Sequence, residues 1–212
     1  MKVLIAGANG STGRLAIEKA IEQGYQPIAM IRDPKQADEL EHKGAQTVIA
    51  DLEGDVSEAV QQADAVIFAA GSGSSTGDDK TIAIDQDGAI KLIDAAKKHN
   101  VKKFVMLSSI GTDAPERAPE EMKLYLRSKA VADEYLRNAE IPYTIVRPGA
   151  LSDDEGSGKI AASKSVNPKG SIPREDVAEV LVACLSEPST QNQTFEIISG
   201  DRSISEAIQS IM

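Results

Sequence analysis

The sequence has one cysteine, Cys184, among its 212 residues, and few aromatic side chains. A single cysteine excludes an internal disulfide and a zinc site built on several thiolates. Aromatic residues make up 3% of the chain, and 33 acidic residues outnumber 23 basic ones, which gives a formal net charge of −10. Because this charge repels a phosphate polymer and few rings are available for base stacking, we expect no nucleic acid partner.

A long apolar stretch and a targeting signal are also missing. No apolar run reaches 18 residues, and Met1 is not followed by a basic, an apolar and a cleavage-site region. We therefore expect a cytoplasmic protein that does not bind a membrane. Neither histidine belongs to a cluster with metal-ligand spacing, so we expect no metal. The length predicts one domain, residues 1–212.

Short β-branched runs alternate with longer amphipathic segments along the whole chain. Near-continuous apolar strands are typical of a parallel sheet that is buried on both faces, and the alternation predicts a doubly wound α/β fold with a mainly parallel sheet. Two segments, 71–79 and 152–173, show little periodicity and are predicted to be active-site loops, with about 150–175 on the substrate side. The expected strands are 3–6, 28–31, 47–50, 65–69, 103–107, 144–147 and 194–198, and the expected helices include 13–22, 82–99 and 174–185.

Three glycines, Gly7, Gly10 and Gly13, follow the first predicted strand and open the first predicted helix. Glycine permits a tight turn and lets the backbone and the free N–H groups of a helix start approach a diphosphate. We interpret the segment as a dinucleotide-binding turn, and the alternative is an ordinary strand-to-helix connection. The cofactor contacts predicted here are Gly7, Asn9, Gly10, Ser11, Thr12, Gly13 and Arg14.

The end of the second predicted strand indicates which dinucleotide is preferred. Arg32 stands where NAD-binding chains usually carry a carboxylate, and Arg14 adds a second guanidinium, so we expect NADP rather than NAD. Both arginines are alternatively solvated surface charges. Asp33, the carboxylate beside Arg32, is as readily explained as the N-cap of the next helix as by a contact with the ribose. After the third strand, Asp51 and Leu52 are predicted to border the adenine, although Asp51 is equally consistent with a turn.

A second group of polar residues lies in the other half of the chain. Ser108 and Ser109 end a predicted strand, and Tyr125 and Lys129 stand four residues apart on the following helix, which puts them on one face. A phenol donates or accepts a proton poorly at neutral pH unless nearby positive charge stabilises the phenolate, and Lys129 could supply such a charge. A serine hydroxyl opposite would hold the substrate oxygen. The alternative is that Tyr125 only packs and Lys129 is solvated.

The segments GANGSTGR, IRDP, FVMLSSIGT, YLRSKAVADEYL and IPYTIVRPGAL together resemble the atypical short-chain dehydrogenase/reductases, specifically the NmrA-like proteins often labelled epimerase or dehydratase. The resemblance covers essentially the whole chain. It implies a Rossmann fold whose seven-stranded sheet binds NADP, and it maps the catalytic set onto Ser109, with Ser108 as the alternative, Tyr125 and Lys129. It also implies that the turn Arg147-Pro148-Gly149 borders the nicotinamide. Further cofactor contacts expected are Ala70, Gly71, Lys129 and Pro148.

Two departures from the family pattern bear on function. Asp85 stands three residues before Gly88, where related extended enzymes carry asparagine, and it either accepts a hydrogen bond near the site or is an exposed helical carboxylate. The short region after Arg147 favours a small carbonyl, quinone or flavin-like substrate under a 152–173 lid. We therefore expect an NADP-dependent oxidoreductase, monomeric or homodimeric. The alternatives are a redox sensor without turnover and a sugar-nucleotide epimerase or dehydratase.

Overall fold

A large central sheet organises the chain, and the computed structural model describes residues 1–71, 73 and 77–211. Its strands are β1 Lys2–Ala6, β2 Gln26–Ile31, β3 Gln46–Ile49, β4 Ala65–Phe68, β5 Lys103–Leu107, β6 Tyr143–Pro148, β8 Lys159–Ser163, β10 Gln193–Ser199 and β11 Arg202–Ser203. Their order is β11-β8-β10-β6-β5-β4-β1-β2-β3. All neighbours from β3 to β10 are parallel, while β8 runs antiparallel to both β10 and β11.

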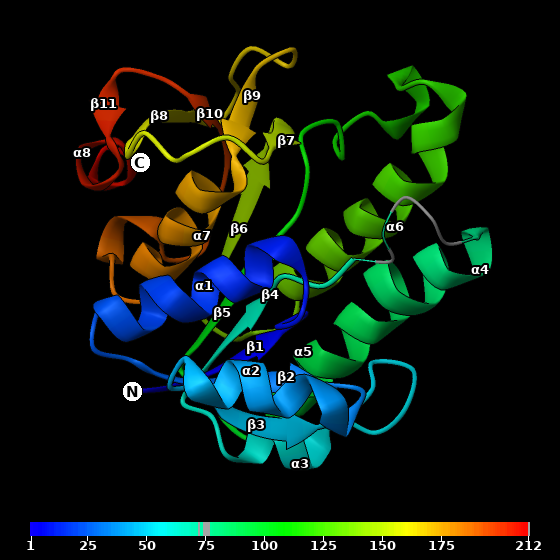
Figure 1. The fold of residues 1–212 in the computed structure, drawn as a ribbon. Coiled ribbons are helices and arrows are strands. Elements are labelled where there is room, and N and C mark those ends of the chain that lie inside the picture. Colours follow the sequence, from blue (N-terminus) through cyan, green and yellow to red (C-terminus); the bar gives the residue numbers. More distant parts are fainter. Residues whose placement is uncertain (72, 74–76, 212) are drawn as a thin grey trace.

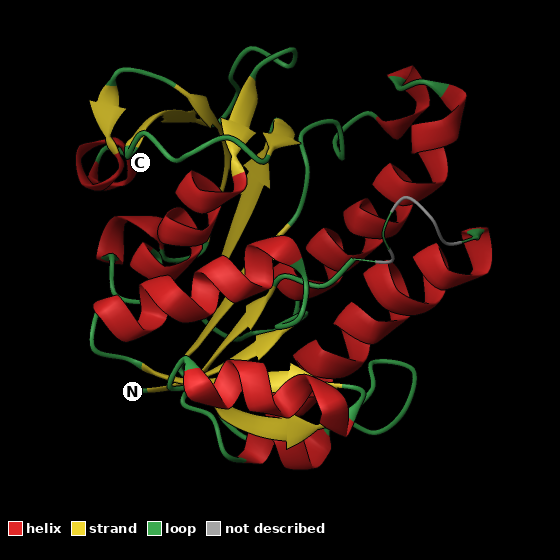
Figure 2. Cartoon of the chain, viewed as in Figure 1, coloured by secondary structure: helices red, strands yellow, loops and turns green. Residues whose placement is uncertain are grey.

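Helices cover both faces of this sheet (Figures 1 and 2). The pattern follows from alternation within each strand: Val3 and Ile5 pack into one core, and Leu4 and Ala6 into the other. One layer holds α1 Ser11–Glu22, α2 Ala37–His42, α7 Arg174–Ala183 and α8 Ile204–Gln209; the other holds α3 Ser57–Gln61, α5 Ala89–Lys98 and α6 Glu120–Arg137. Within the described residues, no helix is both long and apolar enough to cross a lipid bilayer. The doubly wound Rossmann-like single domain is confirmed.

The expected strands are present, but the sheet is wider than the family pattern implies. It has nine strands rather than seven, because β8 and β11 add to the edge beyond β10. The prediction that 152–173 is one loop is therefore wrong. Residues 159–163 form β8, and a small parallel sheet joins β7 Ala150–Ser152 to β9 Ser171–Pro173. Short strands of this kind take their conformation from a pairing partner, so periodicity within the segment does not reveal them.

The predicted helix 82–99 is real but not uniform. Its first part is a π-helix, η2 Thr81–Gly88, which follows the short α4 Asp78–Lys80 and continues into α5. Gly88 lies where a Cβ atom would come within 2.8 Å of the Leu52 side chain. Of the predicted loop 71–79, residues 72 and 74–76 lie outside the described residues.

The lone cysteine is buried, as the sequence predicted. Cys184 is 0% exposed at the end of α7, packed in the same core as β1 and α1. The 3-10 helices are η1 Pro34–Gln36, η3 Pro115–Arg117 and η4 Pro188–Thr190.

Candidate functional site

The glycine-rich turn lies where the strand order reverses, between β1 and β4. Gly7 has φ +85°, and a Cβ atom there would lie 2.6 Å from the Ala70 backbone. A Cβ atom on Gly13 would lie 2.1 Å from the Gly7 carbonyl oxygen, so α1 packs against the turn more closely than any side chain permits. Helix α1 begins without a side-chain cap or an acidic residue in its first turn. This uncapped helix start at the switch point fits a diphosphate.

The two arginines of the predicted nucleotide site differ in their surroundings. Arg14 forms an ion pair with Glu39 and donates to the Asn9 side-chain oxygen at 2.5 Å. Arg32 is exposed immediately after β2. Asp33 accepts from the Lys35 backbone N–H at 3.0 Å in a capping box, so its role as a cap is confirmed. The preference for NADP stays a prediction.

Asp51 and Leu52 follow β3 at the carboxyl ends of the parallel strands, where the glycine-rich turn also lies. The Asp51 carboxylate accepts from the Glu53 backbone N–H at 3.0 Å, which is the turn interaction considered as its alternative role. Leu52 is 5% exposed and packs against Gly88 of η2. Contact of this pair with adenine stays a prediction.

Helix α6 carries the predicted catalytic pair, and the alternative of a solvated lysine does not hold. Lys129 is 2% exposed, and its Nζ donates to the carbonyl oxygens of Ala70 at 3.3 Å and Leu107 at 3.2 Å. The same Nζ lies 5.9 Å from the centre of the Tyr125 ring. The Ser108 hydroxyl donates to Asp133, whereas the Ser109 hydroxyl, which donates to the Ile110 carbonyl oxygen at 3.1 Å, lies close enough to Tyr125 to lower the pKa of its phenol. Ser109, Tyr125 and Lys129 thus lie together beside the glycine turn.

Asp85 belongs to the same site. Its carboxylate is 0% exposed, and Oδ1 lies 3.1 Å from Lys129 Nζ. A Cβ atom on Gly71 would lie 3.4 Å from the same oxygen. The alternative of an exposed helical carboxylate is therefore wrong. Both partners of this ion pair are removed from water. In the protein interior the attraction between their charges is stronger than in water.

Burial and these charges decide the protonation of Tyr125 and Lys129. Burial raises the pKa of Tyr125; Lys129 acts in the opposite direction, while Asp85 and Asp133 add to the rise. Burial lowers the pKa of Lys129, but Asp85, Tyr125 and Asp133 together outweigh it and leave that pKa raised. At neutral pH the site therefore holds a neutral phenol beside a charged ammonium group.

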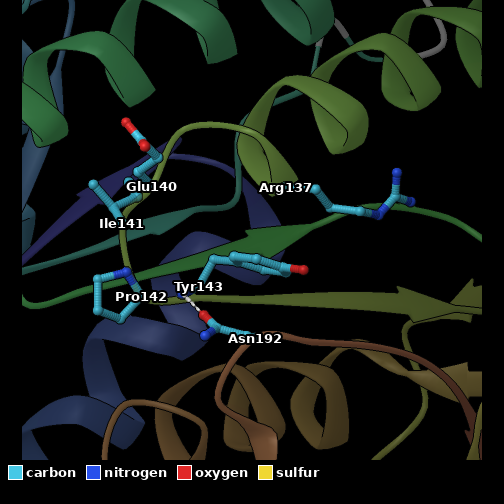
Figure 3. A pocket seen from close by; sticks show the side chains of 6 residues that line it. All are labelled: Arg137, Glu140, Ile141, Pro142, Tyr143 and Asn192. Carbon is cyan, nitrogen blue, oxygen red and sulfur yellow. Dashed lines mark hydrogen bonds between the residues drawn. The ribbon is translucent and has the colours of Figure 1, made fainter.

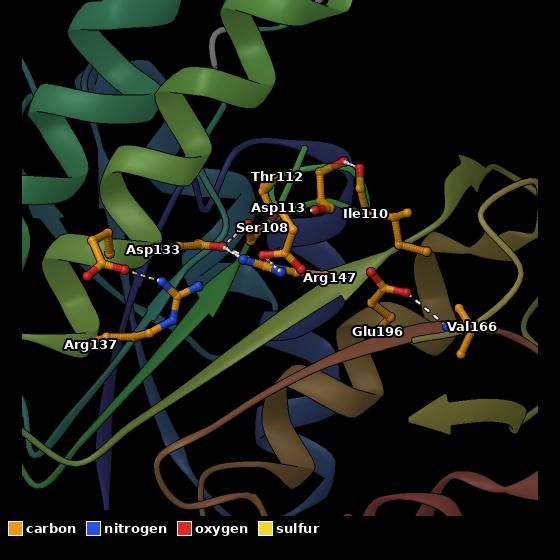
Figure 4. Close-up of polar contacts among 11 residues, drawn as sticks. Ser108, Ile110, Thr112, Asp113, Asp133, Arg137, Arg147, Val166 and Glu196 are labelled. Atoms are coloured by element: carbon orange, nitrogen blue, oxygen red, sulfur yellow. Dashed lines mark hydrogen bonds and ion pairs between the residues drawn. The ribbon is translucent and has the colours of Figure 1, made fainter. Parts of the chain in front are cut away.

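Sequence reasoning did not identify Asp133, which lies at the centre of a buried polar network (Figure 4). Its Oδ2 accepts from Ser108 Oγ at 2.9 Å and from Arg147 Nε at 3.0 Å. Arg147, 3% exposed, also contacts Asp113 at 2.7 Å. Asp133 Oδ1 is buried without a hydrogen-bond partner among the described residues. The signal in the sequence was its spacing, because Tyr125, Lys129 and Asp133 repeat every four residues along one helix face.

The predicted nicotinamide turn is held on two sides. The Pro148 carbonyl oxygen accepts from the Ile110 backbone N–H at 3.0 Å, which joins the end of β6 to the segment after Ser109. A Cβ atom on Gly149 would lie 2.2 Å from the Gly170 carbonyl oxygen. Pro148 is thus placed next to the Ser109 segment, and its contact with a cofactor stays a prediction.

Two cavities lie at opposite ends of the parallel strands. One of about 340 Å³ opens beside the start of α1 and is lined by Ser11, Leu15, Asp153, Asp154, Glu155, Arg174 and Glu175. The other, of about 460 Å³, is lined by Arg137, Glu140, Ile141, Pro142, Tyr143 and Asn192 (Figure 3). The second one adjoins the amino end of β6, away from the carboxyl ends that hold Ser109 and the glycine turn, and it has no part in the candidate site.

Comparison with known proteins agrees with this geometry. A family model described as NAD(P)H-binding matches residues 7–188. The uncharacterized sugar epimerase YhfK of Bacillus subtilis is 40% identical over 100% of both chains. A Bacillus halodurans structure described as a candidate NAD-dependent epimerase/dehydratase is 44% identical over 99% of both chains, with a TM-score of 0.96. The Lactococcus lactis oxidoreductase ylbE is 29% identical over 100% of this chain and 96% of that one, with a TM-score of 0.86. The resemblance to NmrA-like atypical short-chain dehydrogenase/reductases is confirmed, and a nicotinamide cofactor is supported.

Proposed function

Because the chain belongs to the NAD(P)H-binding family, we propose that it is an NADPH-dependent reductase of a small carbonyl, quinone or flavin-like acceptor. The observation that carries the proposal is the meeting of Ser109, Tyr125 and Lys129 beside the glycine turn. The similarity to a protein described as an oxidoreductase, over the whole chain, supports the same reaction class. The residue roles below are part of the proposal.

Each side chain has a distinct task in this reaction. When bound, the reduced nicotinamide supplies a hydride to the acceptor. With a carbonyl or quinone acceptor, Ser109 Oγ donates a hydrogen bond to the acceptor oxygen, and Tyr125 Oη transfers its proton to that oxygen and is later reprotonated from solvent; with a flavin-like acceptor a ring nitrogen takes the place of that oxygen. Lys129 holds the nicotinamide ribose. The uncapped start of α1 binds the diphosphate.

The protonation of the site supports reduction over oxidation. A general acid must carry its proton at working pH, and the raised pKa of Tyr125, due first to burial, keeps the phenol protonated. Alcohol oxidation requires the phenolate as a base, which burial and the two nearby carboxylates disfavour.

The test begins with cofactor binding and ends with turnover. NADPH and NADH are titrated into the purified protein by calorimetry, and loss of nicotinamide absorbance is then followed with a panel of quinones, flavins, aldehydes and ketones. We expect NADPH to bind and at least one acceptor to be reduced. Tyr125→Phe should abolish turnover and leave NADPH binding intact, with Tyr143→Phe, at the opposite edge of the sheet, as the matched control.

Two other outcomes would replace the proposal. Tight NADPH binding without turnover of any acceptor would favour a redox sensor. The similarity to a protein named a sugar epimerase makes isomerisation the second candidate. It would be recognised by conversion of a sugar nucleotide with NADP present and no net change in nicotinamide absorbance.

A further inference from the structure

Lys129 is held by two carbonyl oxygens and one carboxylate from three separate segments. Its Nζ lies 3.1 Å from Asp85 Oδ1 in η2, 3.3 Å from the carbonyl oxygen of Ala70 after β4, and 3.2 Å from that of Leu107 at the end of β5. An ammonium group has three N–H donors and no acceptor. Two of these donors serve the carbonyl oxygens of Ala70 and Leu107, the ammonium charge is ion-paired with Asp85, and the ring of Tyr125 lies 5.9 Å from Nζ.

The Asp85 carboxylate cancels that charge at short range. The two side chains are 0% and 3% exposed, so water screens neither of them. Tyr125 consequently faces a neutral pair, in which a carboxylate stands next to the ammonium group, instead of a free cation. The stabilisation of a phenolate by a cation falls when a second, opposite charge lies beside that cation.

The backbone is built to bring the carboxylate inward at this point. Asp85 lies within the π-helix η2, and short stretches of π-helix inside α-helices are frequent at functional sites. Gly88 lets the same stretch approach Leu52, since a Cβ atom there would lie 2.8 Å from the leucine side chain.

We propose that Asp85 is a positioning residue that holds Lys129 and neutralises its charge, so that Tyr125 donates a proton to the substrate and does not accept one. This inference rests on the proposed reductase function and deepens it, because it keeps Tyr125 in the protonated form from which reduction starts. Asp85 touches neither acceptor nor hydride in this scheme and acts through Lys129.

The other groups facing Tyr125 do not restore the missing positive charge. Lys129 and Asp133 lie on its own helix, Asp85 faces it from η2, and Ser109 faces it from the segment after β5. Arg147 is directed at Asp133 and Asp113. Consistent with this arrangement, burial raises the pKa of Tyr125, and Lys129 does not offset burial together with the two carboxylates.

The experiment follows ionisation of Tyr125 directly, by NMR of protein labelled at tyrosine Cζ, with Tyr125→Phe used to assign the resonance. In the wild type we expect Tyr125 to stay protonated at pH values where an ordinary tyrosine ionises, about pH 10. Asp85→Asn should move its ionisation to lower pH, with the acid dissociation constant raised at least about tenfold. An unchanged titration in that variant would overturn the inference. Asp87→Asn, an exposed carboxylate in the same π-helix, is the matched control and should titrate as the wild type does.

Asp85→Asn leaves Lys129 as a buried cation without its partner. A second variant decides the matter if Asp85→Asn does not fold. In Asp85→Asn/Lys129→Met both charges are absent, and a buried ion pair is often replaced without loss of stability. If the Asp85–Lys129 pair acts as a neutral unit on Tyr125, then Tyr125 in this double variant titrates as in the wild type. A change of tenfold or more in either direction would contradict neutralisation.

The titration uses no substrate, so its result is independent of the proposed reaction. Failure of every acceptor would refute the reductase function while leaving the titration intact. A wild-type-like titration in Asp85→Asn alongside active turnover would refute the inference alone.

Discussion

Arg147 and Asp133 form a buried ion pair beneath the candidate site, with Arg147 Nη2 2.9 Å and Nε 3.0 Å from the same carboxylate oxygen. Arg147 comes from β6 and Asp133 from α6, and the Ser108 hydroxyl at the end of β5 donates to the pair. The interaction therefore fixes the helix that carries Tyr125 and Lys129 against the strand end that carries Ser109.

Arg147→Met should lower the free energy of unfolding by about 3–5 kcal/mol, because it leaves Asp133 as an uncompensated buried charge. Urea unfolding measures the change. Arg127→Met, which removes an exposed arginine paired with Glu116, is the control and should have little effect. Similar losses in the two variants would contradict the importance assigned to burial.

Gly13→Ala should abolish cofactor binding and destabilise the fold by about 1–3 kcal/mol, the usual cost of overpacking. The added methyl would collide with the Gly7 carbonyl oxygen at 2.1 Å and push α1 away from the turn. Calorimetric NADPH titration and thermal unfolding measure the two effects. The control is Gly54→Ala, whose added carbon meets a neighbour at an ordinary 3.6 Å. Undiminished NADPH binding by Gly13→Ala would refute the predicted diphosphate site.

The rate of reduction should be constant through the neutral pH range and fall only under alkaline conditions. Burial raises the pKa of Tyr125, so its proton-donating form persists as pH rises and is lost only when pH passes that raised value. The pH profile of kcat, measured with whichever acceptor is turned over, checks this. A rate that increases with pH across the neutral range would instead indicate a phenolate acting as a base.

Arg32→Ala should reduce the preference for NADPH over NADH by about tenfold or more, because a guanidinium at the end of β2 recognises the 2′-phosphate. The ratio of the two dissociation constants is the measurement. Arg202→Ala removes another exposed arginine, in β11, and should leave the ratio unchanged. Equal binding of both cofactors by the wild type would already refute the role given to Arg32.

The sequence was sufficient where local pattern determines structure. Runs rich in β-branched residues predicted the strands from β1 to β6 and β10, and the spacing of Tyr125 and Lys129 predicted a shared helix face. It was insufficient where a distant partner decides. Strand β8 exists because β10 pairs with it, and the buried state of Asp133 depends on Arg147, 14 residues away on another element. The burial of Asp85 depends on a π-helix, which periodicity does not distinguish from an exposed α-helical turn.

The antiparallel strand β8 changes how the substrate half of the molecule can respond to a ligand. Residues 159–163 are hydrogen-bonded into the central sheet through β10 and are bordered by β11 on the other side. A flap that hinges as one piece from 152 to 173 would have to tear this ladder apart. If the proposed reductase binds its acceptor on this side, adjustment to different acceptors would be confined to the short turns on either side of β8, and selectivity should change with the residues of those turns more readily than with the strand between them.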